Sequence, residues 1–302
     1  MKFPSVAIII PTRGRQESLK VCLRQILPYV TQHSECMIVV TDDGDAHETR
    51  AALGDEFSRI QVIQGPHRGP AANRNCGVAH SQGDLLIFLD DDCRPQSDLV
   101  AEYQRAAGAE PECGVFEGRI TAEGKGTGFG DTAPSNETGG YLWSCNFAMR
   151  RNLFTSIGGF DERYPFPAME DVDLHFRVAR KSQIRFLPTA RVFHGIERRV
   201  GRKILRHYAL SHLLYLHLHG LKATRHGPLF FIRVLVHEAI FGGRRYLRGQ
   251  AAKDPHHLLL VIWTNTQLLL IALFWRFHPY LAKKFFPACC AGCRSIHASF
   301  AD

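Results

Sequence analysis

The sequence predicts an α/β protein with a mostly parallel sheet flanked by helices, followed by a basic helical C-terminal region. Strand and helix signals alternate through roughly the first hundred residues, as in parallel sheets that helices cover on both faces. The clearest strand signal is the apolar run at 85–89, which is typical of a buried parallel strand. Three carboxylates, at 90–92, follow this run directly. Open α/β sheets bind ligands at the carboxyl ends of their strands, so these acids are the first candidates for a functional site.

The elements of the first half follow from the spacing of apolar residues. Continuous apolar runs predict strands at 6–10, 37–40 and 85–89, and a short third strand is expected at 60–63. A helix between the first two strands is predicted from six residues that recur at helical spacing: Leu19, Cys22, Leu23, Ile26, Leu27 and Val30. A further helix is expected at 71–80, after a turn rich in glycine and proline.

The signals beyond residue 92 are weaker but continue the same class of fold. A stretch rich in Gly, Thr and Ser at 124–140 predicts a mobile loop. The remaining expected elements are a strand at 144–150, a helix at 171–181 and strands at 184–187 and 192–193. We therefore expect one α/β domain at 1–195 and a separate region at 196–302.

The charge of the chain is unevenly distributed between these two regions. The formal net charge is +8, but residues 196–302 hold 16 Lys or Arg and only 4 Asp or Glu, a net charge of +12. Residues 1–195 therefore carry a net charge of −4. This asymmetry indicates that the two regions meet different partners.

Apolar, aromatic helices edged with basic residues are expected in the basic region, at 204–219, 229–241 and 258–277. The last is almost long enough to span a bilayer, but polar residues at 264–267 interrupt it. Two interpretations remain open: a basic amphipathic segment lying on an anionic membrane surface, or a helical subdomain packed on the α/β core. A pI near 9.1 also suits nucleic acid, but no recognition motif is present, and we expect no such partner.

The cysteines and the N-terminus indicate a cytoplasmic protein. The nine cysteines are scattered and odd in number, which favours reduced thiols over a disulfide framework. The strand at 6–10 follows the N-terminus without a charged leader, an apolar core or a cleavage site, so we expect no signal peptide. A C-terminal cluster, Cys289, Cys290 and Cys293 with His297, lacks the second cysteine pair of a usual zinc site, and we expect no metal there.

The three acids at 90–92 need a cation, because adjacent carboxylates repel one another. Oxygen ligands suit a hard divalent ion such as Mg²⁺ or Mn²⁺, which would also carry a nucleotide diphosphate. Taken alone, the acids fit equally well an acidic turn that caps the next helix. The rest of the sequence shifts this balance.

Five segments resemble the family 2 glycosyltransferases, which have the GT-A fold. The resemblance extends over roughly residues 5–194. The segments are VAIIIPTRGR at 6–15, VVTDDG at 39–44, GPAANRNCG at 69–77, LIFLDDD at 86–92, and IGGFDE at 157–162 followed by Glu170 and Asp171. Each segment alone is a weak signal, but five in the family's order make a chance resemblance improbable.

The resemblance implies a nucleotide-binding half at 1–92 and an acceptor half at 93–195. The residues that it implies for binding the nucleotide-sugar are Pro11, Thr12, Arg13, Asp42, Arg68, Arg74, Asp90 and Asp91. Asp42 would accept a hydrogen bond from the imide N–H of uracil or thymine, so the implied donor is UDP- or dTDP-linked. Taken alone, Asp42 is more often a helix cap or an Asx-turn, and an arginine such as Arg74 is more often an unpaired surface residue.

The acids at 90–92 match the family's Asp-x-Asp motif. The resemblance implies Asp92 as a direct ligand of Mg²⁺ or Mn²⁺, with Asp90 or Asp91 contacting the ribose or a metal-bound water. Asp90 is therefore also a candidate metal ligand. His194 ends a Pro-x5-His segment that completes the metal site in some members, although a lone His at a strand end is more often a simple hydrogen-bonded residue. The metal would act as a Lewis acid on the leaving nucleotide.

Glu170 and Asp171 match the family's catalytic Glu-Asp pair. In the family the Asp removes the proton of the acceptor hydroxyl, and one displacement inverts the anomeric centre of the sugar. The pair opens a predicted helix, whose dipole favours ionised carboxylates, so both acids are expected to stay ionised. Trp143 and Asn146 match positions near the acceptor or donor sugar. Taken alone, Glu170 and Asp171 fit an ordinary pair of first-turn charges.

We therefore expect an inverting, metal-dependent transferase that moves a sugar to a lipid-linked or cell-envelope saccharide at the cytoplasmic face of the plasma membrane. A processive synthase is less favoured, because its Gln-x-x-Arg-Trp motif is not evident. A nucleotidyltransferase would require a glycine-rich loop after the first strand, where PTRGR stands at 11–15. The alternative is a catalytically silent sugar-nucleotide or glycan-binding module that the basic region recruits to a membrane.

Overall fold

The computed structural model describes residues 3–124, 131–198, 202–219, 266 and 269–270. The chain divides into two compact units. The first consists of Met1–Gly124 and Ala133–Ile196, and the second of Lys125–Thr132 and Glu197–Asp302. The first unit contains every candidate site residue named above, and it is described first.

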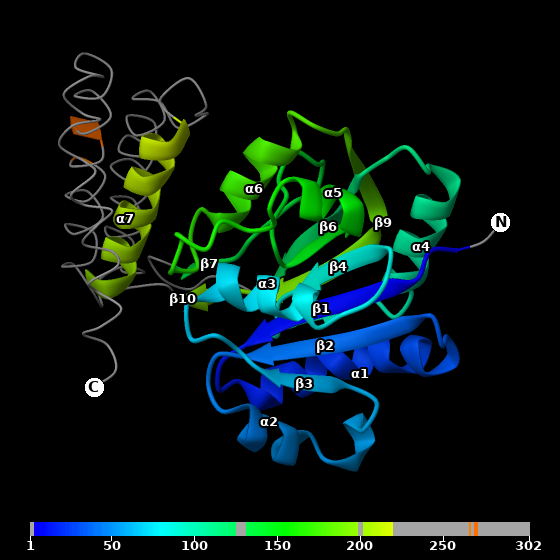
Figure 1. Ribbon diagram of the computed structural model, residues 1–302. Coiled ribbons are helices and arrows are strands. Elements are labelled where there is room, and N and C mark those ends of the chain that lie inside the picture. Colours follow the sequence, from blue (N-terminus) through cyan, green and yellow to red (C-terminus); the bar gives the residue numbers. More distant parts are fainter. Residues whose placement is uncertain (1–2, 125–130, 199–201, 220–265, 267–268, 271–302) are drawn as a thin grey trace. The chain divides into compact units, whose positions relative to one another are not determined.

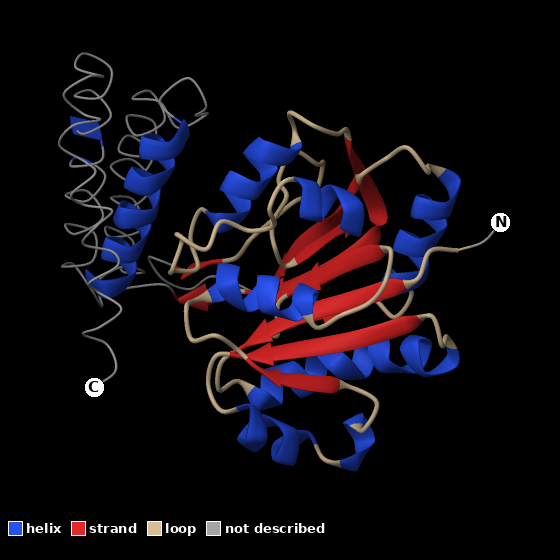
Figure 2. Cartoon of the chain, viewed as in Figure 1, coloured by secondary structure: helices blue, strands red, loops and turns tan. Residues whose placement is uncertain are grey.

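A sheet of eight strands runs through the first unit, in the order β3-β2-β1-β4-β8-β6-β9-β5 (Figures 1 and 2). The strands are β1 (Val6–Thr12), β2 (Cys36–Asp42), β3 (Gln61–Gln64), β4 (Leu85–Leu89), β5 (Cys93–Pro95), β6 (Val115–Glu123), β8 (Asn146–Arg150) and β9 (Ile184–Gly195). The pairings β1·β2, β1·β4, β2·β3 and β6·β9 are parallel, whereas β8 runs antiparallel to β4 and β6, and β5 runs antiparallel to β9. The prediction of a mostly parallel sheet flanked by helices is confirmed.

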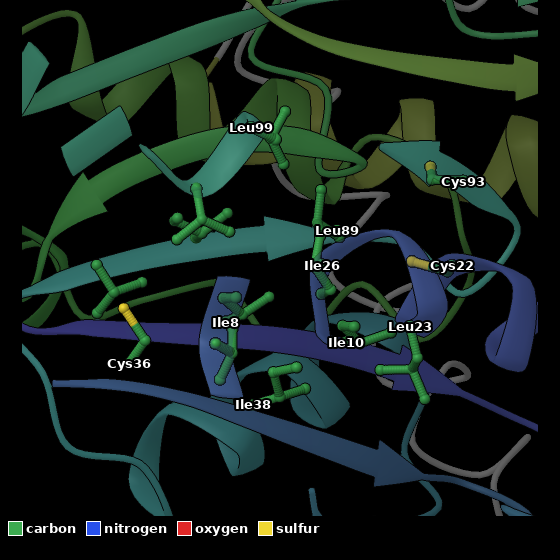
Figure 3. Packing of buried hydrophobic residues seen from close by; sticks show 14 of the residues in the cluster. Ile8, Ile10, Cys22, Leu23, Ile26, Cys36, Ile38, Leu89, Cys93 and Leu99 are labelled. Carbon is green, nitrogen blue, oxygen red and sulfur yellow. The ribbon is translucent and has the colours of Figure 1, made fainter. Parts of the chain in front are cut away.

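Helices cover both faces of this sheet (Figure 2). The helices are α1 (Gln16–Gln32), α2 (Ala46–Leu53), α3 (Pro70–Ala79), α4 (Leu99–Ala109), α5 (Arg151–Ser156) and α6 (Glu170–Val178), with a short 3₁₀ turn at Asp55–Phe57. Successive side chains of a strand point to opposite faces, so β1 contributes to two separate cores. Ile8 and Ile10 pack with Leu23 and Ile26 of α1 (Figure 3). Residues of α2 and α4 complete that core.

The second core lies on the other face of the sheet and contains the remaining side chains of β1. Ala7 and Ile9 belong to it, together with Ala71 of α3, Phe154 of α5 and Leu174 of α6. The helix that carries the predicted catalytic pair is therefore held by apolar packing on the same face as α3. Both cores are fully buried at their centres, which gives the carboxyl edge of the sheet a rigid base.

Most predicted elements of the first unit are present, with differences at their ends. The run at 85–89 coincides with β4, whereas the first two strands extend two residues further than predicted, to Thr12 and Asp42. The helix expected at 71–80 is α3, and the one expected at 171–181 is the shorter α6. The two strands expected at 184–187 and 192–193 are parts of the single strand β9, whose pairing with β6 shifts register between Gly118 and Arg119.

The second unit is described at fewer residues. It contains the antiparallel pair β7 (Asp131–Thr132) and β10 (Glu197–Arg198), and α7 (Arg202–His219), which includes the helix expected at 204–219. Residues 125–130 of the predicted loop, the helix expected at 229–241, most of that expected at 258–277 and the C-terminal cysteine cluster lie outside the described residues. Of the helices that the structure does describe, none combines the length and the apolar character needed to cross a membrane.

Candidate active site

The carboxyl ends of three neighbouring strands bring the predicted donor-binding residues to one edge of the sheet. Thr12 ends β1, Asp42 ends β2, and Asp90 follows β4 directly. Because these three strands are parallel, their carboxyl ends meet at the same edge. The sequence Asp90, Asp91 and Asp92, here called the acid run, is therefore placed where open α/β sheets bind ligands.

Arg15, which directly precedes α1, holds two members of the acid run. Its Nη2 lies 2.6 Å from Asp91 Oδ1, and its Nη1 lies 2.7 Å from Asp92 Oδ2. Thr12 Oγ1 donates a further hydrogen bond of 2.6 Å to Asp91 Oδ2. Burial raises the pKa of Asp91 to about 7, although Arg15 and Thr12 act in the opposite direction. Sequence reasoning assigned no role to Arg15.

Arg74 of α3 holds the third member of the acid run and joins it to α6. Its Nη2 lies 2.6 Å from Asp90 Oδ1, and its Nη1 lies 3.3 Å from Glu170 Oε1. The guanidinium also lies over the ring of Phe160, 5.5 Å from its centroid. Burial acts to lower the pKa of Arg74, but the charges of Asp90 and Glu170 outweigh it and raise that pKa. The arginine is only 3% exposed, so it is a buried link between carboxylates and not the unpaired surface residue that it resembled when taken alone.

Asp92 and His194 form the donor set for a candidate metal ion. Cys93 of β5 is paired with His194 of β9, which brings Asp92 Oδ1 within 3.3 Å of His194 Nε2. His194 Nδ1 lies 2.8 Å from the carbonyl oxygen of Gly195, so a proton on Nδ1 leaves the lone pair of Nε2 available to a metal. Burial lowers the pKa of His194, but the adjacent Asp92 carboxylate more than offsets this and the pKa is raised.

A third potential ligand, the thiol of Cys93, lies in the same group of atoms, all within 4.8 Å of one another. Burial raises its pKa well above the ordinary value, and its Sγ lies 3.7 Å from the carbonyl oxygen of Cys145, to which it donates. A protonated thiol is a poor ligand. The oxygen of Asp92 and the nitrogen of His194 remain, and this donor set fits Mg²⁺ or Mn²⁺.

The predicted catalytic pair opens α6 after a residue with unusual backbone geometry. Met169 has φ 70°, in the left-handed region of the backbone that residues other than glycine rarely adopt. Among the described residues other than glycine, His67 is the one other residue with a positive φ. Strained backbone of this kind is concentrated at functional sites, because the surrounding structure must hold it. Here it sets the start of α6 and thus the positions of Glu170 and Asp171.

The two acids of the pair differ in environment. Glu170 is buried, and this burial, with the charge of Asp171, raises its pKa to about 8 against the influence of Arg74. The expectation that the helix dipole keeps both acids ionised is therefore wrong for Glu170, because the cost of burying the charge exceeds the effect of the dipole. Burial also raises the pKa of Asp171, opposed by Arg74 and by the backbone N–H groups of Val172 and Ser144. Asp171 is only partly buried.

The segment that precedes this pair is fixed to α3 by Asn75. Its Nδ2 donates to the carbonyl oxygen of Phe160 at 2.9 Å and to Glu162 Oε1 at 3.0 Å, and its Oδ1 accepts from the Phe160 N–H at 3.0 Å. A Cβ at Gly159 would lie 2.8 Å from Asn75 Oδ1, so only glycine allows this approach. The segments at 69–77 and 157–162, which were recognised separately in the sequence, are therefore in direct contact through Asn75.

Two neighbouring aspartates shape the expected base-binding region. Asp42 is fully buried, with its Oδ1 accepting from Gly44 N–H at 2.6 Å and its Oδ2 from Thr49 Oγ1 at 2.6 Å. These contacts correspond to the Asx-turn interpretation, and contact between Asp42 and a base stays a prediction. Asp43, which sequence reasoning did not single out, accepts from the N–H groups of His67 at 2.9 Å and Gly69 at 3.0 Å. It anchors the turn before α3.

The other three candidates differ in their exposure to solvent. Pro11 is buried in β1, and Arg13 is exposed just beyond it. Arg68 is exposed and forms an ion pair of 2.8 Å with Glu162. The roles of these three residues toward a donor remain predictions.

Asn146 and Trp143 are placed differently from each other. Asn146 is buried, and its amide donates to the carbonyl oxygens of Arg119 and Ala190, each at 2.9 Å, where the pairing of β6 with β9 shifts register. Both amide hydrogens are thus used within the sheet, and a position of Asn146 near a sugar stays a prediction. Trp143 is partly buried and stacks on Tyr141, with ring centroids 5.7 Å apart.

Comparison with known proteins agrees with this geometry. Residues 7–158, half of the chain, match the family described as Glycosyl transferase family 2. The chain is 28% identical over 211 residues to the pre-mycofactocin glycosyltransferase of Mycobacterium tuberculosis, covering 63% of this chain and 42% of that protein. It is 27% identical over 137 residues to the GalNAc(5)-diNAcBac-PP-undecaprenol beta-1,3-glucosyltransferase of Campylobacter jejuni, covering 41% and 43%. The chain thus spans less than half the length of these relatives.

Two solved structures share the fold. The mannosyltransferase PcManGT from Pyrobaculum calidifontis, in complex with GDP-Man and Mn²⁺, has a TM-score of 0.51 at 15% identity and covers 100% of this chain and 89% of its own. GalNAc-T7 with UDP, GalNAc and Mn²⁺ has a TM-score of 0.52 at 14% identity, covering 76% and 53%. With the strand order, the acid run and the family match all pointing the same way, the chain belongs to glycosyl transferase family 2, a family of sugar-transferring enzymes, and has the GT-A fold.

Proposed function

We propose that this chain is an inverting, metal-dependent glycosyltransferase that moves a sugar from a nucleotide-sugar donor to a saccharide acceptor. The observation that carries the proposal is the buried Arg74. It connects Asp90, at the end of β4, with Glu170, at the start of α6. Arg74 thus links the acid run, which includes the candidate metal ligand Asp92, to the pair Glu170 and Asp171, which includes the candidate base, although the two are about eighty residues apart in the sequence.

Asp171 acts as the general base. It is partly buried at the N-terminus of α6, and the N–H groups of Val172 and Ser144 stabilise its carboxylate form. In that form it accepts the proton of the acceptor hydroxyl as the oxygen attacks the anomeric carbon. General-base catalysis of this kind contributes on the order of 10²–10⁴ in rate. Glu170 is engaged with Arg74, and burial raises its pKa to about 8, so Asp171 is favoured over Glu170 for this role.

Asp92 and His194 would hold the metal ion, and Mg²⁺ or Mn²⁺ fits their oxygen and nitrogen donors. When bound there, the ion supplies Lewis-acid stabilisation of the leaving nucleotide. Both solved neighbours contain Mn²⁺, which supports a divalent ion and leaves the choice between the two to experiment.

The donor that we propose is UDP- or dTDP-linked, and the acceptor is a lipid-linked saccharide. The support for the acceptor comes from relatives whose names describe polyprenyl diphosphate substrates. One is the Campylobacter jejuni enzyme above, and another is the N-acetylglucosaminyl-diphospho-decaprenol L-rhamnosyltransferase of Mycobacterium tuberculosis, 39% identical over 80 residues and matched over 26% of each chain. A lipid-linked acceptor places the reaction at a membrane face, and we propose the cytoplasmic face.

The proposal is tested by thermal stabilisation with a panel of nucleotide sugars, each with Mn²⁺ and with a chelator. A ligand that binds the native state raises its apparent stability, so a true donor raises Tm only when the metal is present. With that donor and a lipid-linked acceptor, NMR of the product should show an anomeric configuration opposite to that of the donor. Retention of configuration would reject the single displacement, and equal stabilisation in chelator would reject the metal.

A further inference from the structure

Two arginines neutralise the acid run, but they do so in different settings. Arg74 has a side chain only 4% exposed and is enclosed by Asp90 and Glu170. The side chain of Arg15 is 46% exposed, and it reaches Asp91 and Asp92 from the solvent side of the edge. Arg74 is therefore part of the buried framework, whereas the half-exposed Arg15 can release Asp92 without unpacking a core.

Arg15 contacts the carboxylate to which the metal is assigned. Asp92 has one oxygen, Oδ2, at 2.7 Å from Arg15 Nη1, and the other, Oδ1, at 3.3 Å from His194 Nε2. A divalent ion held by Asp92 and His194 would thus lie beside a guanidinium group on the same carboxylate. Two cations on one carboxylate repel each other, so the ion and Arg15 compete for Asp92.

The departure of Arg15 would leave the rest of the acid run in place. Asp91 keeps the hydrogen bond of 2.6 Å from Thr12 Oγ1, and Asp90 keeps Arg74. The guanidinium itself needs a new anionic partner, and the planar group matches phosphate oxygens in a bidentate fashion. A nucleoside diphosphate that arrives with the metal provides such a partner at the same edge.

We propose that Arg15 is an exchangeable counter-ion of the donor site: it occupies Asp92 in the free enzyme and transfers to the diphosphate of the donor when the metal binds. This inference rests on the proposed function. It has two consequences of opposite sign. Arg15 weakens the binding of the metal alone, and it strengthens the binding of a nucleoside diphosphate once the metal is present. Metal and nucleotide are then coupled through one side chain, and coupling of this kind is typically about 5- to 150-fold.

The experiment compares the wild type with Arg15→Gln, Arg15→Lys and a matched control, Arg24→Gln. Arg24 is also an exposed arginine near the start of the chain, but it pairs with Glu56, with both contacts at 2.9 Å. Binding of Mn²⁺ without nucleotide is measured by electron paramagnetic resonance of the free ion. Binding of UDP, dTDP and GDP at saturating Mn²⁺ is measured by calorimetry.

In Arg15→Gln we expect Mn²⁺ alone to bind roughly tenfold more tightly and the nucleoside diphosphate to bind roughly tenfold more weakly, in line with the usual size of such couplings. Arg15→Lys keeps the charge but loses the planar fork, so Mn²⁺ binding should stay near wild type while the diphosphate still weakens. Arg24→Gln should match the wild type in both. Because Arg15→Lys retains a cation beside Asp91, it also provides a readout if Arg15→Gln folds poorly.

Unchanged or weaker binding of Mn²⁺ to Arg15→Gln would overturn the competition. Tighter Mn²⁺ binding with unchanged nucleotide affinity would overturn the transfer to the diphosphate. Either result leaves the proposed function intact if the wild type still binds a nucleoside diphosphate only with Mn²⁺. A wild type that binds no Mn²⁺ in the presence of any of the three nucleotides would instead reject the metal-dependent function itself.

Discussion

The candidate site contains two clusters built from the same chemistry, arginine between carboxylates, in different surroundings. On the metal side, Arg15 is half exposed and pairs with Asp91 and Asp92. On the base side, Arg74 is buried between Asp90 and Glu170. The buried Arg74 joins the end of β4 to the start of α6, whereas the half-exposed Arg15 is the side chain that we propose exchanges its carboxylate partner. If the proposal holds, this difference in arginine exposure separates the part of the site that sets geometry from the part that responds to a ligand.

The largest effect is expected at the base. Asp171→Asn removes the proton acceptor but keeps the size of the side chain, so turnover should fall by roughly 10²–10⁴, while donor binding stays near wild type. Steady-state rates and calorimetry with the donor measure the two quantities separately. Asp98→Asn is the matched control, because Asp98 is an exposed acid at the N-terminus of α4 that makes no side-chain capping bond. Full turnover in Asp171→Asn would mean that another group is the base.

The two arginines should differ in their contributions to stability. Arg74→Gln leaves two carboxyl groups at the buried end of the cluster without their cation, and removal of one partner from a buried ion pair typically costs about 3–5 kcal/mol. Arg15→Gln removes a half-exposed cation, for which about 1 kcal/mol is expected. Urea denaturation gives both free energies of unfolding. Equal losses would contradict the division into a structural and an exchangeable pair.

The pH dependence of stability sharpens the same comparison. The pKa of Glu170 is raised from 4.5 to about 8, so between these values the folded protein binds this proton more tightly than the unfolded chain does. The stabilisation is complete below pH 4.5 and is lost as the pH rises toward 8. Unfolding of the wild type should therefore become easier over this range, and Glu170→Gln should show a smaller slope.

The exposed Glu112→Gln serves as the control for this measurement and should keep the wild-type slope. If the slope persisted in Glu170→Gln, it would have to come from another group.

The pH dependence of activity provides a separate test. Asp171 titrates with Glu170 as a pair, and its pKa is raised, so the acidic limb of the kcat/KM profile should lie above the ordinary range of an aspartate. The apparent pKa of that limb belongs to the pair of acids and not to either one alone.

The sequence predicted the acid run because local signals were sufficient for it. A continuous apolar run marks a buried parallel strand, and the residues after it must lie at the carboxyl edge. The antiparallel direction of β8 has no comparable local signal. The strand β9 was divided in two because its middle, Pro188 to Arg191, is not an apolar run, and its pairing with β6 shifts register there.

The arginines that pair with the acid run could not be predicted from local sequence patterns. The need for a cation was predicted from the repulsion of three adjacent acids. Part of the positive charge that they need is supplied by the chain's own Arg15 and Arg74. The contacts that reveal this join residues 76 and 16 positions apart. Likewise, Asp42 and Asp43 are neighbours of identical type, and only the folded structure shows that one anchors the turn into α2 and the other the turn before α3.

The smallest predicted effects distinguish the ligands on the metal side. His194→Gln removes the nitrogen donor and should weaken Mn²⁺ binding by about tenfold or more, since even residues that only orient metal ligands typically contribute 10- to 100-fold. Cys93→Ala should leave Mn²⁺ affinity unchanged, because burial keeps that thiol protonated and it donates to the carbonyl oxygen of Cys145. Cys93 is buried in the core that contains α1, so its substitution should lower Tm slightly, and affinity must be measured well below Tm. If Cys93→Ala lost the metal while His194→Gln kept it, the donor set assigned to Asp92 and His194 would be wrong, and a thiolate site selecting softer ions would replace it.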